Sequence, residues 1–171
     1  EKPLFLQIGF TGPHEPWDPL PRHLDLYKEK EMPPRVMRDG ELAEKPPQHL
    51  AHLEMHANTD HESQIDLRGR TQEEMDEMKR HYFGNISTVD EKLGEILEAL
   101  KDRGWLENSL LVFCSDHGEL LGDHGLAYKW LMYDPIVHIP MIVRTPESVN
   151  HARIVTDLVS LMDVGPTVLE A

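Results

Sequence analysis

The chain is poor in cysteine, in aromatic residues and in basic residues. Its one cysteine, Cys114, cannot form an internal disulfide, and its place in an apolar run predicts a buried, unreactive thiol. Lysine and arginine number 17 against 31 aspartates and glutamates, which gives a net charge of −14. This charge argues against a nucleic-acid partner, because little could neutralise a phosphate backbone. A small anionic substrate remains compatible with it, since a local cationic pocket can outweigh the global field.

Long apolar runs are also missing. None reaches the roughly 20 residues of a membrane-spanning helix, so we expect no membrane partner. The sequence opens on EKPLFLQIGF, an apolar pattern without an initiator methionine, and we therefore expect a piece of a longer protein whose compartment stays open. The 171 residues, 39% of them hydrophobic, suffice for one domain with a sizeable core.

Apolar patterns predict strands at 3–10, 109–114 and 138–146. A helix is expected from Thr71, whose capping box with Glu74 precedes a stripe of apolar residues at three- and four-residue steps, up to Gly104. A second helix is expected at the end of the chain. Helices that alternate with apolar strands indicate an α/β fold with a mostly parallel sheet.

Residues 20–70 look different, with proline pairs, many charges and little periodicity, and we expect an irregular, partly mobile insertion or lid. Within it, His49, His52 and His56 would share a helix face and, with His61, could hold zinc. The alternative is a solvated segment, as the flanking prolines and carboxylates suggest.

The segment FCSDHGELLGDHGLAYKW, residues 113–130, places many titratable groups directly after an apolar strand. Functional groups gather at the carboxyl ends of strands in open α/β sheets, and Asp116 with His117 offers an oxygen and a nitrogen ligand for a divalent cation. Asp116 could instead cap a following helix. A serine hydrolase is not indicated, because adjacent Ser, Asp and His cannot form a relay and GxSxG is missing.

Two further residues are candidates for binding an anion. Lys129 could stabilise negative charge on a leaving group, or it could be an exposed lysine whose stem rests on Tyr128 or Trp130. His14, in GPHEPW, could donate a hydrogen bond to an anion or protonate a leaving oxygen, or it could be a loop histidine satisfied by the backbone.

Together, SDHGELLGDHGLAYK, GPHEPW, HIPMIVRTP and LMDVGPTVLEA resemble the sulfatase family of the alkaline-phosphatase-like superfamily. The resemblance covers residues 1–20 and about 71–171. It implies a partial α/β/α sandwich, in which 1–171 is a fragment of one sulfatase catalytic domain, and a sulfuric ester hydrolase that acts on a sulfated small molecule or glycan.

The resemblance also implies roles for single residues. Asp116 and His117 match the positions that ligate a divalent metal, most often Ca²⁺, with Mn²⁺ or Zn²⁺ in related hydrolases. Lys129 and His14 match the residues that contact the ester and assist its cleavage. His124 is expected in the substrate pocket, where it and Asp123 would orient the loop.

One departure from the family pattern concerns the nucleophile. The family converts Cys or Ser of a Cys/Ser-x-Pro-x-Arg motif to formylglycine, and no such motif occurs in the 171 residues. We expect it upstream. We also expect the isolated chain to be inactive and, because its sheet edges would be open, either to associate with itself or to fold poorly. A phosphonate monoester or phosphodiester hydrolase, or a non-catalytic binding module, are the alternatives.

Overall fold

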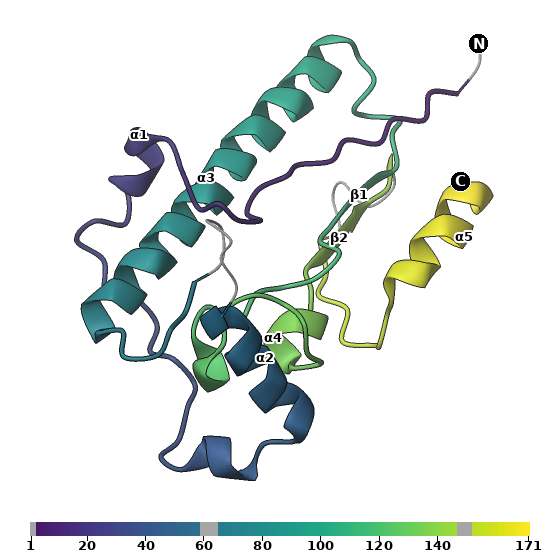
Figure 1. Cartoon of the computed structure of the whole chain (residues 1–171). Coiled ribbons are helices and arrows are strands. Elements are labelled where there is room, and N and C mark those ends of the chain that lie inside the picture. Colours follow the sequence, from purple (N-terminus) through teal and green to yellow (C-terminus); the bar gives the residue numbers. More distant parts are fainter. Residues whose placement is uncertain (1–2, 59–64, 147–151) are drawn as a thin grey trace. The chain divides into compact units, whose positions relative to one another are not determined.

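The computed structural model describes residues 3–58, 65–146 and 152–171. They divide into two units, each described by itself below, and Figure 1 labels their helices and strands. The first comprises residues 1–95 and 121–127, and the second comprises 96–120 and 128–171.

The longest element is helix α3, Gln72–Asp102, which begins in the first unit and ends in the second. The predicted capping box is confirmed: the Glu74 amide donates to Thr71 Oγ1 at 3.2 Å, and the Thr71 amide donates to the Glu74 carboxylate at 2.8 Å. Gly104 ends the helix with a left-handed φ of 66°. The apolar stripe is buried only near the start, at Met75 and Met78, and it loosens toward Ile86, which is 38% exposed.

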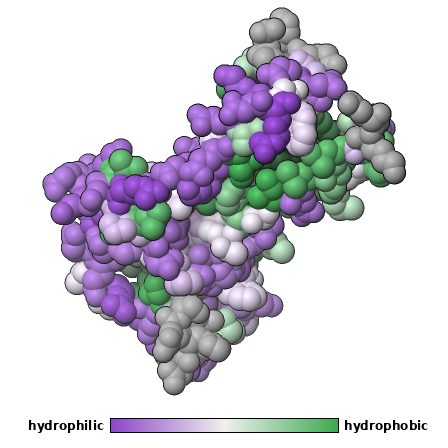
Figure 2. All heavy atoms as spheres, turned by 90° about the horizontal axis from the view of Figure 1, so that it is seen from above, coloured by the Kyte–Doolittle hydropathy of each residue, from purple (hydrophilic) through white to green (hydrophobic). Residues whose placement is uncertain are grey.

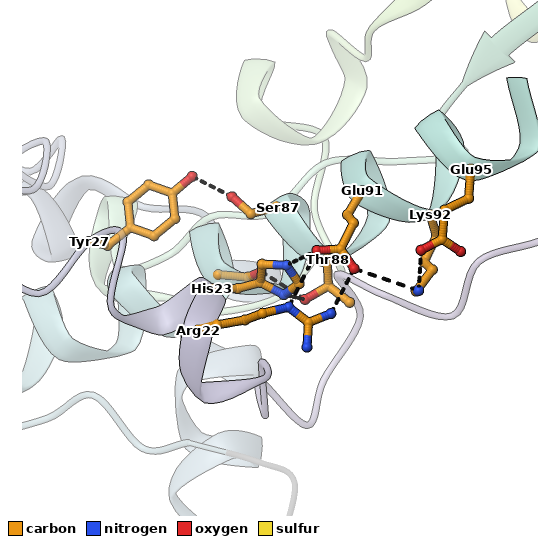
Figure 3. A network of polar contacts seen from close by, with 9 residues as sticks. Arg22, His23, Tyr27, Ser87, Thr88, Glu91, Lys92 and Glu95 are labelled. Carbon is orange, nitrogen blue, oxygen red and sulfur yellow. Dashed lines mark hydrogen bonds and ion pairs between the residues drawn. The ribbon is translucent and has the colours of Figure 1, made fainter. Parts of the chain in front are cut away.

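Helix α1, Pro21–Leu24, is tied to α3 by a polar network (Figure 3). The Glu91 carboxylate accepts hydrogen bonds from Arg22 at 2.6 Å and from buried His23 at 2.8 Å. Thr88 Oγ1 lies 2.7 Å from the other His23 ring nitrogen. Hydrogen bonding to Arg22, and then to His23, lowers the pKa of Glu91 to about 2 from an ordinary value of 4.5. The network therefore requires the ionised carboxylate.

Replacing Glu91 with glutamine should loosen α1. A carboxyl group whose pKa is lowered on folding stabilises the fold above its unfolded pKa, near 4.5, and this contribution is lost as the pH falls toward about 2. We expect faster amide hydrogen exchange at Leu24 and Asp25 in Glu91→Gln at pH 7, with the difference from wild type shrinking below pH 4.5. Glu95→Gln, whose carboxylate pairs with Lys92, is the control. Equal exchange in both variants would contradict the prediction.

The segment 20–70 is more regular than we expected from the sequence. It contains helix α2, Pro47–Asn58, and a short 3₁₀ helix at Glu41–Glu44, in addition to α1. Burial lowers the pKa of both His49 and His56, since an imidazolium is poorly solvated there. In the described part of the chain, no three His, Cys, Asp or Glu side chains lie close enough together to hold a metal ion. The hypothesis of a zinc site in this segment therefore gains no support. His61 lies outside the described residues.

Two predicted strands of the second unit are confirmed. Strand β1, Leu111–Cys114, pairs with β2, Met141–Arg144, in an antiparallel ladder that sets Leu111 opposite Arg144. The predicted mostly parallel sheet is therefore not confirmed. The predicted buried thiol is wrong, because Cys114 is exposed. Ile142 and Val143 of β2 are exposed as well, since the sheet has only these two strands in the described residues.

Short helices complete the second unit, whose most buried side chains include Leu120, Tyr128 and Ile136. Helix α4 spans Asp134–Val137. Helix α5, Val164–Glu170, confirms the predicted terminal helix and follows a short 3₁₀ turn that Ser160 and Asp163 cap reciprocally.

The predicted buried strand at 3–10 is wrong. These residues have no regular secondary structure, and Leu4, Phe5 and Leu6 are 65%, 70% and 59% exposed. An apolar pattern becomes a strand only where a neighbouring strand accepts its backbone hydrogen bonds, and this segment pairs with none in the described structure. Figure 2 shows apolar side chains at the surface, and exposed apolar residues also occur in the second unit, at Ile142, Ile154, Leu158, Met162 and Leu169.

None of the described helices combines the length and the hydropathy needed to cross a bilayer.

Candidate active site

Asp116 and His117 follow β1 after one intervening residue, Ser115, and so lie just past the end of the strand, as predicted. The Asp116 side chain is 85% exposed and His117 is 32% exposed. Asp116 Oδ1 accepts the His117 amide at 3.1 Å, while Asp116 Oδ2 lies 3.8 Å from His117 Nε2. Two ligand bonds of about 2.0–2.6 Å each add up to more than this separation, so one cation can reach both atoms.

The ring orientation of His117 suits a metal ligand. His117 Nδ1 lies 2.8 Å from the Gly118 carbonyl oxygen, which only accepts, so Nδ1 carries the proton. Metal-binding histidines commonly donate one ring N–H to a carbonyl or carboxylate and coordinate through the other nitrogen. Nε2, the nitrogen nearer Asp116, is then the ring nitrogen without a proton. Among the described residues no third acidic, cysteine or histidine side chain joins this pair.

Gly118 allows two segments of backbone to approach each other closely. Its amide donates to the Ile136 carbonyl at 2.8 Å, and a Cβ at position 118 would overlap the carbonyl group of Pro135. Any larger residue would push the backbone after β1 away from α4. The glycine of the first DHG motif therefore serves close packing of backbone on backbone.

Lys129 is half-buried and follows a firmly held residue. The Tyr128 side chain is 1% exposed, and its backbone lies in the left-handed region, at a φ of 72°. The Glu119 carboxylate accepts the amides of Leu120, at 3.1 Å, and of Tyr128. The stem of Lys129 therefore begins at a backbone position fixed by packing and by hydrogen bonds.

His14, in the first unit, sits on a turn that closes on itself. Its amide donates to the Thr11 carbonyl at 3.1 Å, and Trp17 Nε1 donates to the Pro13 carbonyl at 3.1 Å. The imidazole is 48% exposed, with Nδ1 2.9 Å from the Glu15 carbonyl and 3.2 Å from the Glu15 carboxylate. Carbonyl and carboxylate both accept, so Nδ1 carries the proton here too.

His124, also in the first unit, faces residues of the 20–70 segment. His124 Nδ1 lies 2.5 Å from Glu41 Oε1, and Lys45 Nζ lies 2.5 Å from the same oxygen. Val36 contacts the loop twice: its amide donates to Asp123 at 2.7 Å, and its carbonyl accepts the His124 amide at 2.8 Å. Lys45, then the Arg38 amide and then His124 lower the pKa of buried Glu41 to about 2. This segment thus holds the loop 121–127.

The structure places the candidates in two groups. Asp116, His117 and Lys129 lie in the second unit, and His14 and His124 lie in the first. Three residues that hold these groups escaped the sequence analysis, namely Glu119, Glu41 and Lys45. The only signal for Glu119 was its place directly after the first DHG motif. Glu41 and Lys45 carried no signal, because charged residues crowd their whole segment.

The sequence profile of the sulfatase family matches residues 1–171, the whole chain. The chain belongs to the sulfatase family.

Curated sulfatases agree with this assignment. An arylsulfatase of Clostridium perfringens (strain 13 / Type A) is 28% identical over 172 residues, which cover 99% of this chain and 34% of the relative. A choline-sulfatase of Rhizobium meliloti (strain 1021) is 30% identical over 169 residues, covering 99% of this chain and 31% of the relative. The chain thus spans about a third of the length of these sulfatases.

A solved structure supports the fold. The phosphonate monoester hydrolase of Agrobacterium radiobacter superposes with a TM-score of 0.70 at 25% identity, over 86% of this chain and 30% of that one. The chain therefore shares the mixed helix-and-strand architecture of the alkaline-phosphatase-like hydrolases.

Proposed function

We propose that this chain is part of a sulfatase catalytic domain that hydrolyses sulfate esters. The observation that carries the proposal is the match of the whole chain to the sulfatase family. The arrangement of Asp116 and His117 at the end of β1 adds support from the site itself. Within a complete domain, β1 would join a mostly parallel sheet of an α/β/α sandwich.

Asp116 and His117 would hold a divalent cation. An exposed carboxylate oxygen suits Ca²⁺, and Mn²⁺ or Zn²⁺ would accept the imidazole nitrogen more readily. When bound, the ion supplies positive charge beside the oxygens of the ester. The remaining ligands would come from another part of the catalytic domain, as would the formylglycine nucleophile.

Lys129, His14 and His124 would bind the ester. A sulfate group in the transition state carries negative charge on its equatorial oxygens and on the leaving oxygen, and cationic donors stabilise both. Lys129 provides a point charge for these oxygens. His14 would donate a proton to the departing alcohol, and His124 would line the pocket, where its contacts with Glu41 and Lys45 fix its ring.

The substrate would be a sulfated small molecule or glycan, and the copies of the chain could assemble into an oligomer. A phosphonate monoester or phosphodiester hydrolase is the second candidate, and the superposition on the phosphonate monoester hydrolase is compatible with it. The same cation, lysine and histidine suit tetrahedral phosphorus as well as sulfur.

A peptide map and a substrate panel test the proposal on the full-length protein, produced in a host that makes formylglycine. We expect formylglycine in a Cys/Ser-x-Pro-x-Arg peptide and faster turnover of an aryl sulfate than of a phosphodiester or a phosphonate monoester. A reversed order would establish the second candidate. An unmodified residue that cannot be converted, with no turnover of any ester, would reject both and point to a non-catalytic binding module.

A further inference from the structure

We infer that Glu119 is a positioning residue for Lys129. Its carboxylate accepts hydrogen bonds from the backbone just before Lys129 and so fixes the point from which the lysine side chain projects. The inference rests on the role proposed above for Lys129. It concerns a residue to which neither the sequence motifs nor the family match assigns a task.

The Glu119 carboxylate joins the two ends of the loop formed by residues 120–128. It accepts the Leu120 amide at 3.1 Å and also the amide of Tyr128, nine positions along the chain from Glu119. The Leu120 amide also donates a backbone hydrogen bond to the Tyr128 carbonyl, at 3.2 Å, which joins the same two ends of the loop. One side chain thus joins the two ends of the loop immediately before Lys129.

These hydrogen bonds hold Tyr128 in an unfavourable backbone conformation. Tyr128 adopts a φ of 72°, which a bulky residue with a Cβ rarely does unless its surroundings enforce it. Its ring is 1% exposed and Leu120 is 2% exposed, so packing fixes both side chains. The Tyr128 peptide still needs a partner for its amide, and a charged acceptor provides a stronger one than a neutral oxygen. Outlying backbone held in this way is typical of functional sites.

The position of Lys129 follows from this peptide. A lysine that stabilises charge on a leaving oxygen must already point at that oxygen before the reaction. Reorientation during the reaction would require free energy and so offset the stabilisation of the transition state. A displacement of about 1 Å can lower a rate about 100-fold. Loss of the Glu119 carboxylate should therefore impair the step that Lys129 assists, rather than binding in general.

A series of aryl esters that differ in the acidity of their phenol tests whether Glu119 acts through Lys129 in the full-length protein. Phenols of decreasing acidity depend increasingly on stabilisation of the leaving oxygen. We expect Glu119→Ala to lower kcat by about 10- to 100-fold, with the loss growing for the less acidic phenols and KM nearly unchanged. Glu119→Gln keeps the size and one acceptor oxygen, so it should show a smaller loss with the same trend. It also carries the test if the alanine variant does not fold.

A double-mutant cycle and a control complete the design. If Glu119 acts through Lys129, adding Glu119→Ala to Lys129→Met should lower the rate no further. Glu107→Gln, at an exposed glutamate of the same unit, should behave as wild type. A loss equal for all phenols, losses that multiply in the double variant, or a wild-type rate in Glu119→Gln would overturn the inference.

Hydrogen exchange separates this inference from the proposed function. The Tyr128 amide should be protected in wild type and should exchange at least about 10-fold faster in Glu119→Ala, whether or not the protein turns over an ester. Unchanged protection would overturn the inference even in an active enzyme. If the protein hydrolyses none of the three ester classes but the Tyr128 amide loses protection in Glu119→Ala, the proposed function is rejected. The hydrogen bond by which Glu119 fixes the Tyr128 backbone would still be established.

Discussion

Replacing Lys129 with methionine should lower kcat/KM of the full-length protein for an aryl sulfate by about 100- to 1,000-fold. Methionine keeps an unbranched apolar stem of similar length, so the half-buried position stays filled while the ammonium group is lost. The ammonium is the charge that we assign to the leaving oxygen, and the loss should therefore appear mainly in kcat. Steady-state kinetics with the formylglycine-bearing protein measures it.

Two further variants sharpen this result. Lys101→Met removes an exposed lysine from the last turn of α3 in the same unit and should leave the kinetics unchanged. Lys129→Arg keeps the charge but replaces a compact ammonium with a planar fork, so it should recover only part of the rate. A Lys129→Met enzyme within twofold of wild type would show that the lysine is an ordinary half-buried side chain.

Local patterns carried the parts of this site that the sequence predicts well. The helix from Thr71 and the strand before Asp116 each depend on residues a few positions apart, and the structure has both. The contacts that hold the site are of another kind. The Glu41 carboxylate meets His124 across 83 positions, and only the tertiary fold brings such residues together.

The two largest errors in the fold have physical causes. In α2 the buried positions include two histidines, His49 and His56, so the helix lacks the aliphatic stripe by which an amphipathic helix is recognised. Pro47 at its start was a usable signal, because proline fits the first helical turn. Residues 3–10 show the reverse case: their pattern suits a strand, but a strand also needs a partner, which local sequence does not supply.

Replacing Asp116 with asparagine should abolish most of the activity by weakening metal binding. Asparagine has the same shape and one carbonyl oxygen but no negative charge, and the affinity of oxygen-ligand sites for Ca²⁺ depends on the number of charged ligands. We expect metal affinity to fall at least about 100-fold and kcat/KM to fall about 1,000-fold at limiting metal. Calorimetric titration of the chelator-treated protein with Ca²⁺, Mn²⁺ and Zn²⁺ in turn measures the affinity apart from activity.

The control and the chelation experiment decide whether charge at this position matters. Asp102→Asn, at an exposed carboxylate of α3, should bind metal and turn over ester as wild type does. Chelation should inactivate the wild-type protein, and the ion bound most tightly should restore it. Excess metal should rescue Asp116→Asn in part, because weaker binding is compensated by concentration. Wild-type metal affinity in Asp116→Asn would instead mean that this carboxylate only accepts the His117 amide, as it does at 3.1 Å, and that His117 binds the ion with other ligands.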